Sequence, residues 1–244
     1  LRTVTLNDGQ TFSFPAGDPY WQYYFLSRIE YEKEIRSFIL SMPRSPDFFL
    51  DGGANFGFWS IFMSRTTSTV AIEASSATIE MLRLNNGRNG DRFRVEHAAL
   101  SDRAAAEISL SKYTDPSSLS IVDGGSDNVE SVVTTTVDDT IEKNYSGEGP
   151  ILVKLDVEGA EIAAFEGAKR TFERDSVFIY EDHGNDKTCR PTAYLLEHGK
   201  RVYAISKDGV PKQVFGVDEV RAIKTNPRVG YNFAALGDQA PLLK

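Results

Sequence analysis

The chain lacks the features of a disulfide-stapled, membrane-spanning or nucleic-acid-coating protein. It has one cysteine, Cys189, among 244 residues, which excludes an intrachain disulfide and a multi-thiolate metal cluster. Its longest nearly apolar stretch, residues 56–63, is far shorter than the roughly 20 residues of a membrane span. Acidic residues outnumber basic ones by 35 to 27, and the net charge of −8 disfavours a phosphate backbone as the main partner. We therefore expect a cytoplasmic globular protein with no transmembrane segment and no nucleic-acid partner.

Short apolar runs that alternate with helical stretches dominate the middle of the chain. Five runs are candidate strands, at residues 48–50, 69–72, 93–98, 151–155 and 177–180, and helices are expected near residues 56–65, 77–88 and 160–174. This rhythm is typical of right-handed βαβ units and a parallel sheet. A further helix near residues 193–198 precedes two closing strands at residues 201–205 and 231–236.

Two regions depart from this alternation of strands and helices. Residues 3–14 alternate polar and apolar around Asn7-Asp8-Gly9, which predicts a hairpin, and residues 20–42 have helical spacing. We expect residues 1–45 to form a hairpin and a helical lid, and residues 46–244 to form the ligand-binding domain. Residues 101–150, with the Ser-, Gly- and Asp-rich stretch 123–128, are interpreted as an insertion or long connection.

The first chemical motif is DGGANFG at residues 51–57, where a strand passes into a helix. Glycines at such a turn let backbone N–H groups approach a ligand at the carboxyl edge of the sheet. A dinucleotide site would need a second glycine where Ala54 stands, and Asp51 would lie close to its phosphates. A methyl donor such as S-adenosylmethionine has no phosphate and carries two positive groups, so an acid here attracts it. The motif therefore favours the methyl donor.

Glu73 is the second element, 22 residues after Asp51 at the end of the next strand. In either nucleotide interpretation, a carboxylate at this position reaches the ribose hydroxyls. The third element is KLDVEGAE at residues 154–161, which places three carboxylates at the end of the fourth strand. Such a group is costly at a strand end unless it binds something.

Together, DGGANFG and the run VKLDVEGAE at residues 153–161 resemble the FkbM-type methyltransferases. Further landmarks occur in the expected order: Tyr31-Glu32, AALSD at 98–102, residues 117–119 and the threonine-rich residues 134–139. The resemblance covers roughly residues 30–185, and Gly52 replaces the more usual aliphatic residue. It implies a class I methyltransferase (Rossmann-like) α/β fold with a seven-stranded, mostly parallel sheet, helices on both faces and a C-terminal antiparallel hairpin. It also implies S-adenosylmethionine-dependent O-methylation of a hydroxyl on a sugar, a polyketide or another secondary metabolite.

This resemblance assigns roles to residues of the motifs. The expected donor-binding residues are Asp51, Gly53, Asn55 and Gly57 at the first turn, Glu73 at the ribose, Ser101 and Asp102 near the adenine, and Asp156. Asp156 and Glu158 are also expected to border the reacting centre.

The base that accepts the hydroxyl proton is expected after the fifth strand. Glu181 and His183 match the family's Glu and His two residues apart, and an imidazole titrates near working pH, so His183 is the candidate base. Alternatively, Asp156, Glu181 and Asp182 would hold Mg²⁺, which lowers the pKa of the hydroxyl. We favour the metal-free version because the resemblance does not oblige a metal. His97 and His198 are interpreted as structural.

Two rival functions stay open at this point. One is an NAD(P)-dependent oxidoreductase on a related sheet, against which Ala54 counts; the other is a catalytically silent protein that binds the donor. The aromatic run YWQYYF at residues 20–25 would either stack on a sugar or pack in the core, and core packing is favoured. The acceptor, the methylated position and the oligomeric state are not specified by the sequence.

Overall fold

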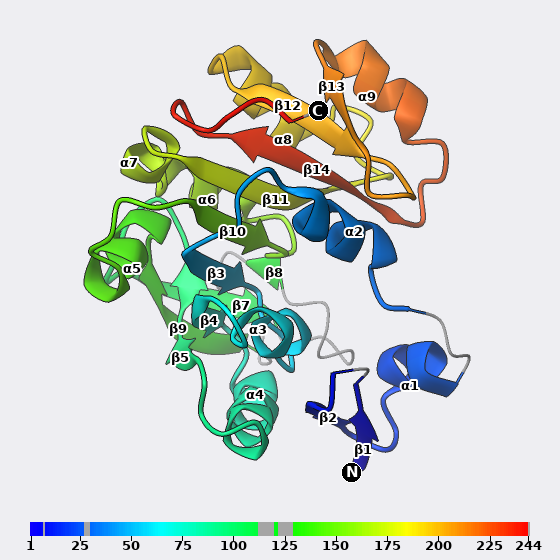
Figure 1. The fold of residues 1–244 in the computed structure, drawn as a ribbon, viewed down its shortest axis with the longest axis vertical. Helices are drawn as coiled ribbons and strands as arrows, with labels where there is room; N and C mark the ends of the chain where they lie inside the picture. Colours follow the sequence, from blue (N-terminus) through cyan, green and yellow to red (C-terminus); the bar gives the residue numbers. More distant parts are fainter. Residues whose placement is uncertain (7, 27–29, 112–119, 122–128, 244) are drawn as a thin grey trace.

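The computed structural model describes residues 1–6, 8–26, 30–111, 120–121 and 129–243. Its main feature is an eight-stranded sheet in the order β13-β12-β14-β11-β10-β3-β4-β5 (Figure 1). The five predicted parallel strands are confirmed as β3 (Phe48–Gly52), β4 (Ser68–Glu73), β5 (Arg94–His97), β10 (Ile151–Leu155) and β11 (Ser176–His183). Because these strands are parallel, their carboxyl ends meet at one edge of the sheet.

The C-terminal side of the sheet is antiparallel in part, as expected. Strand β14 (Gly230–Leu236) lies antiparallel between β11 and β12 (Arg201–Ile205). The structure adds an eighth strand, β13 (Pro211–Val214), which forms a hairpin with β12 at the sheet edge. Pro211 is the first residue of this edge strand, a position where the missing N–H of proline is tolerated.

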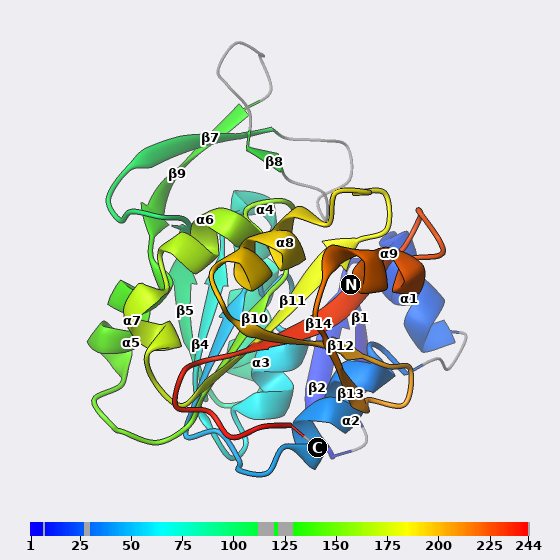
Figure 2. The ribbon, with the colours of Figure 1, turned by 90° about the horizontal axis from the view of Figure 1, so that it is seen from above.

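Helices cover both faces of the sheet (Figures 1 and 2). One layer contains α5 (Val137–Asn144), α6 (Glu161–Glu166), α7 (Lys169–Phe172), α8 (Arg190–Glu197) and α9 (Val217–Ile223), and the other contains α2 (Lys33–Ser41), α3 (Phe58–Met63) and α4 (Ser76–Arg88). Alternate residues of a strand pack against the two helix layers: Phe48 and Leu50 pack against the first, and Phe49 packs against the second. The helix predicted over residues 160–174 is split into α6 and α7 at Gly167, which lies close to the Ser101 carbonyl.

The N-terminal hairpin packs on the same face as α3 and α4. Strands β1 (Arg2–Thr5) and β2 (Thr11–Phe14) confirm the hairpin, although Asn7 of its turn lies outside the described residues. The Asn85 side chain of α4 accepts from the Ser13 N–H at 2.8 Å and donates to the Ser13 carbonyl at 2.9 Å. Phe12 and the following helix α1 (Pro19–Leu26) contribute to a core cluster with Phe56. A lid function for residues 1–45 stays a prediction.

A second, smaller sheet follows β5. It is formed by β6 (Ala99–Leu100), β9 (Val129–Thr135), β7 (Glu107–Ser111) and β8 (Ser120–Ile121), and it projects from the main sheet in Figure 2. This arm occupies the region interpreted as an insertion. The landmark at 117–119 and the stretch 123–128 lie outside the described residues. Within the parts of the chain that the structure describes, no helix combines the length and the apolar character needed to cross a membrane.

Candidate active site

A cavity of about 610 Å³ opens at the carboxyl ends of the parallel strands. This volume lies within the range of small-molecule and cofactor sites, roughly 300–1,000 Å³. Eight of the residues singled out in the sequence line it: Asp51, Gly53, Asn55, Glu73, Asp156, Glu158, Glu181 and His183. The structure therefore brings together side chains from four strand ends that are up to 132 residues apart in sequence.

The turn after β3 is held by close packing and a buried hydrogen bond. Asp51 is buried and its Oδ2 accepts from Ser60 Oγ at 2.6 Å, while burial raises its pKa. Gly53 has φ +74°, and a Cβ at this position would lie 1.9 Å from the Asp156 carbonyl oxygen. Gly53 therefore allows the first turn to touch the segment after β10, and only glycine fits there.

Glu73 connects the turns after β3 and β4. Its two carboxylate oxygens accept from the Asn55 N–H and the Ser75 N–H, each at 2.8 Å. Burial raises the pKa of Glu73 to about 7, against the opposing effect of these two hydrogen bonds. The carboxylate is fixed by backbone donors and lies at the cavity wall, as a ligand-binding group requires.

Three of the expected donor-binding residues do not line the cavity. Gly57 is the N-cap residue before α3, with φ +89°, and a Cβ there would lie 2.6 Å from Leu82 Cδ1, so it serves helix packing. Ser101 donates through Oγ to Asp102 at 3.0 Å, beyond the point where the chain leaves the cavity. The wall at this end is instead apolar and consists of Ala98, Ala99, Leu100, Ile108 and Leu110. The arm therefore contributes to the site, which the sequence did not indicate.

A buried lysine organises the acids at the centre of the cavity. Lys154 Nζ lies 3.0 Å from Asp156 Oδ2 and 3.8 Å from Glu32 Oε2, with its side chain 5 % exposed. Burial opposes the charge of Lys154, but Asp156 and Glu32 outweigh it and raise its pKa. Glu32, which accepts from Trp59 Nε1, has its pKa raised to about 7 by burial. In the sequence, Glu32 and Lys154 stood out only as parts of motifs. The position of Lys154 inside an apolar strand was the one sign that it needs an acidic partner in the interior.

Strand β11 presents Glu181 and His183 to the cavity. The two are separated by one residue, so the pleat places them on one face. His183 Nδ1 accepts from the Asn185 N–H at 3.3 Å. Burial, followed by the negative charges of Asp156 and Glu158, raises the pKa of Glu181 to about 8. His97 and His198 do not line the cavity; His97 Nε2 lies 3.0 Å from the Ala74 carbonyl and His198 stacks on Tyr194.

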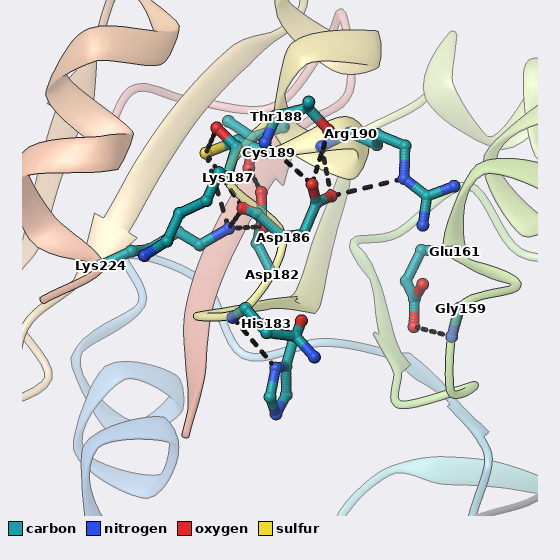
Figure 3. Close-up of polar contacts among 12 residues, drawn as sticks. Gly159, Glu161, Asp182, His183, Asp186, Lys187, Thr188, Cys189, Arg190 and Lys224 are labelled. Atoms are coloured by element: carbon teal, nitrogen blue, oxygen red, sulfur yellow. Dashed lines mark hydrogen bonds and ion pairs between the residues drawn. The ribbon is translucent and has the colours of Figure 1, made fainter. Parts of the chain in front are cut away.

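The structure does not bring together Asp156, Glu181 and Asp182, the ligands of the alternative magnesium site. Asp182 lies on the opposite face of β11, is fully buried, and accepts from Thr192 Oγ1 at 2.7 Å and from Lys224 Nζ (Figure 3). The pleat separates Asp182 from its neighbour Glu181, so the three carboxylates cannot converge. Among the described residues, no three His, Cys, Asp or Glu side chains are grouped for a metal ion.

Lys224 fixes the loop that follows His183. Besides Asp182, its Nζ donates to the Asp186 carbonyl at 2.6 Å and to Cys189 Sγ at 3.5 Å (Figure 3). Asp186 in turn accepts from the Thr188 N–H at 2.9 Å and the Arg190 N–H at 2.8 Å. Lys224 lies outside every sequence motif and 42 residues from Asp182, so no local pattern pointed to it.

A family model matches the part of the chain that contains these four strand ends. Residues 51–208, about two thirds of the chain, match the model of the methyltransferase FkbM domain. The chain belongs to the FkbM methyltransferase family. A comparison with curated proteins finds no significant match.

The class I methyltransferase fold of this chain is supported by one solved methyltransferase with a TM-score above 0.5. A precorrin-6y C5,15-methyltransferase from Geobacter metallireducens is 10% identical with a TM-score of 0.52, and the alignment covers 93% of each chain. A putative methyltransferase from Streptococcus mutans in complex with SAH is also 10% identical, with a TM-score of 0.46 over 85% of this chain and 98% of that one. A geranyl diphosphate methyltransferase in complex with SAM is 9% identical, with a TM-score of 0.47 over 91% and 92%.

Proposed function

We propose that this methyltransferase uses S-adenosylmethionine to methylate a hydroxyl group of a small molecule or glycan. The observation that carries the proposal is the acidic cavity at the carboxyl edge of the sheet, where Asp51, Glu73 and Asp156 meet. Acids favour a cationic donor and repel the pyrophosphate of a dinucleotide. Family membership likewise favours methyl transfer over the nicotinamide alternative.

The cavity lining fits the parts of this donor. Glu73, held by two backbone N–H groups, is suited to accept hydrogen bonds from the ribose hydroxyls. The apolar wall that includes Leu100 and Ile108 suits the adenine ring, in place of the expected Ser101 and Asp102. Asp51, Gly53 and Asn55 are proposed at the methionine end. When bound, the donor supplies an electrophilic methyl group that is transferred from sulfur to oxygen in one in-line displacement.

The protein's own contribution is orientation and removal of a proton. Asp156, held by Lys154, and Glu158 border the region where the hydroxyl must lie. His183 is proposed to take the hydroxyl proton at Nδ1: because Nδ1 accepts from the Asn185 N–H, the neutral ring carries its hydrogen on Nε2, and the substrate hydroxyl replaces the Asn185 N–H as the partner of Nδ1. A positioned base of this kind contributes typically ~10²–10⁴-fold to the rate.

Two measurements test the proposal. Calorimetric titration with S-adenosylmethionine, its demethylated product and NAD should show binding of the first two only; binding of NAD alone would support the oxidoreductase. Tight donor binding without turnover on any hydroxyl acceptor would support the catalytically silent alternative.

The role of His183 is tested by substitution. We expect His183→Ala to bind the donor nearly as well as the wild type while turnover falls by ~10²–10⁴-fold. His198→Ala is the matched control, because His198 stacks on Tyr194 away from the cavity. Normal turnover of His183→Ala would assign the base to another group.

A further inference from the structure

The part of the cavity that the donor does not need is aromatic and acidic. Two tyrosines of α1 and one from the turn before α2 line it, and their rings contact each other edge to face: Tyr20 and Tyr24 at 5.2 Å, Tyr24 and Tyr31 at 5.1 Å. The helical spacing of this aromatic run favoured core packing. That holds for Phe25, which stacks on Phe14 at 5.5 Å, but Tyr20 and Tyr24 face the cavity instead.

The carboxyl groups of Glu34 and Glu181 line the same cavity as these rings. Glu34 of α2 accepts from Asn232 Nδ2 at 3.0 Å, and Asn232 is the partner of Glu181 in the pairing of β14 with β11. Burial raises the pKa of Tyr24, and Glu32 and Glu34 add to this effect, so the Tyr24 ring lies in the field of both acids. One end of the cavity therefore combines π-faces with the carboxylates of Glu34 and Glu181.

Acidic groups far outnumber basic groups in the cavity lining. Seven described carboxylates line it, against two cationic side chains: Glu32, Glu34, Asp51, Glu73, Asp156, Glu158 and Glu181, and Lys154 and Arg228. Lys154 is committed to Asp156 and Glu32. The proposed donor brings one net positive charge, from a sulfonium, an ammonium and a carboxylate. An excess of carboxylates therefore remains around the acceptor.

Glu181 is the group most exposed to this imbalance. Among the described residues its side chain makes no hydrogen bond or ion pair, and the charges that act on it include Asp156, Glu158 and, with opposite sign, Lys154. A cation placed beside Glu181 would relieve the repulsion among the three carboxylates, whereas a phosphate or carboxylate would increase it. Aromatic faces add to the attraction for an ammonium group.

We propose that the acceptor carries a protonated amine near the reacting hydroxyl, as an amino sugar or another amino alcohol does, and that Glu181, Glu34 and the rings of Tyr20, Tyr24 and Tyr31 bind this amine. This inference rests on the proposed function, because the site it describes adjoins the donor and His183. It places the ammonium between an aromatic wall and two carboxylates, an arrangement that selects positive charge. The same groups disfavour phosphorylated and carboxylated acceptors.

The test uses matched probes on the full-length protein saturated with S-adenosylhomocysteine. Glucosamine, galactosamine, trans-2-aminocyclohexanol and tyramine are each compared with their N-acetyl counterparts, and glucuronic acid and glucose 6-phosphate serve as anionic probes. We expect the amines to bind roughly tenfold or more tighter than the acetamides by calorimetry, and the anions not to bind. Equal binding within the pairs, tighter binding of the anions, or no binding of any amine at millimolar concentration would overturn the inference.

Variants locate the effect at the proposed groups. Glu181→Gln should reduce the preference for amines to less than about threefold, and Tyr24→Leu should weaken amine binding more than acetamide binding. Glu197→Gln is the control, since Glu197 is an exposed acid of α8 outside the cavity and its loss changes the net charge equally. An amine preference that survives in Glu181→Gln would also contradict the inference.

The two proposals fail in different ways. If S-adenosylhomocysteine binds and neutral hydroxyl compounds are methylated without any advantage for amines, the proposed function stands and this inference is wrong. If S-adenosylhomocysteine does not bind, the donor site itself is wrong and both proposals fall.

Discussion

Glu181 and Asp182 are adjacent carboxylates at the end of one strand, yet they have opposite surroundings. Asp182 is fully buried, paired with Lys224 and hydrogen-bonded to Thr192 beneath α8. Glu181 faces the cavity beside other acids, and its pKa is raised to about 8. The pleat of β11 alone separates a structural carboxylate from one that is available to a ligand. A function assigned from residue type at a strand end therefore needs the face as well as the position.

The largest expected effect comes from removing the charge of Asp182, the buried member of this pair. We expect Asp182→Asn to lower the free energy of unfolding by about 3–5 kcal/mol, because it leaves the buried Lys224 charge without its counterion. Glu181→Gln is the matched control and should be no less stable than the wild type at pH 7, since it removes a carboxyl that burial and neighbouring acids disfavour as an anion. Urea denaturation measures both; equal losses would contradict the distinction between the two faces.

The cavity at this edge of the sheet depends on the close approach of Gly53 to the Asp156 carbonyl. We expect Gly53→Ala to lower the free energy of unfolding by about 2–3 kcal/mol and to weaken donor binding, because φ is +74° and the new Cβ would collide with the Asp156 carbonyl. Gly17→Ala is the control, since no atom lies within 4 Å of its Cβ position and its φ is ordinary. A fully stable Gly53→Ala protein with normal donor affinity would show that this contact does not shape the site.

Much of the fold followed from local patterns in the sequence. The five parallel strands and the helices after β3 and β4 were predictable because each is a short apolar or amphipathic run with a clear beginning and end. Helix α5, helix α9 and strand β13 were missed; they are only eight, seven and four residues long, so each offers too few positions for a periodic pattern to stand out.

The candidate site was predictable where a motif lies at the end of a strand. Asp51, Glu73, Asp156 and His183 reach the cavity because the carboxyl ends of parallel strands meet there. Asp182 does not reach the cavity, because alternate residues of β11 face opposite sides of the sheet and Asp182 contacts Thr192. Ser101 does not line the cavity, because the chain turns away after Leu100. Glu32 and Lys224 act through tertiary contacts across more than 25 residues, which no local pattern encodes.

The pH dependence of stability sharpens the comparison between the two faces. The pKa of Glu181 is about 8 in the folded protein and near 4.5 when unfolded, so the folded state binds the extra proton between these values and its stability falls as pH rises through them. We expect the stability of Glu181→Gln relative to wild type to increase by about 1–2 kcal/mol from pH 5 to pH 8, after allowance for solvent screening. Urea denaturation at several pH values measures this; a constant difference would contradict the raised pKa.

The smallest expected effect concerns donor binding at Glu73. Because its pKa is about 7, the carboxylate able to accept from both ribose hydroxyls is formed as pH rises from 6 to 8, and donor affinity should rise with it. Glu73→Gln should therefore bind S-adenosylmethionine roughly tenfold more weakly at pH 8 but only slightly more weakly at pH 6. Glu32 and Glu181 also gain charge over this range, but they are unchanged in the variant, so the difference isolates Glu73. Glu80→Gln, an exposed acid of α4 paired with Arg83, is the control. An equal loss at both pH values would mean that Glu73 positions the turn through Asn55 and Ser75 without contacting the ribose.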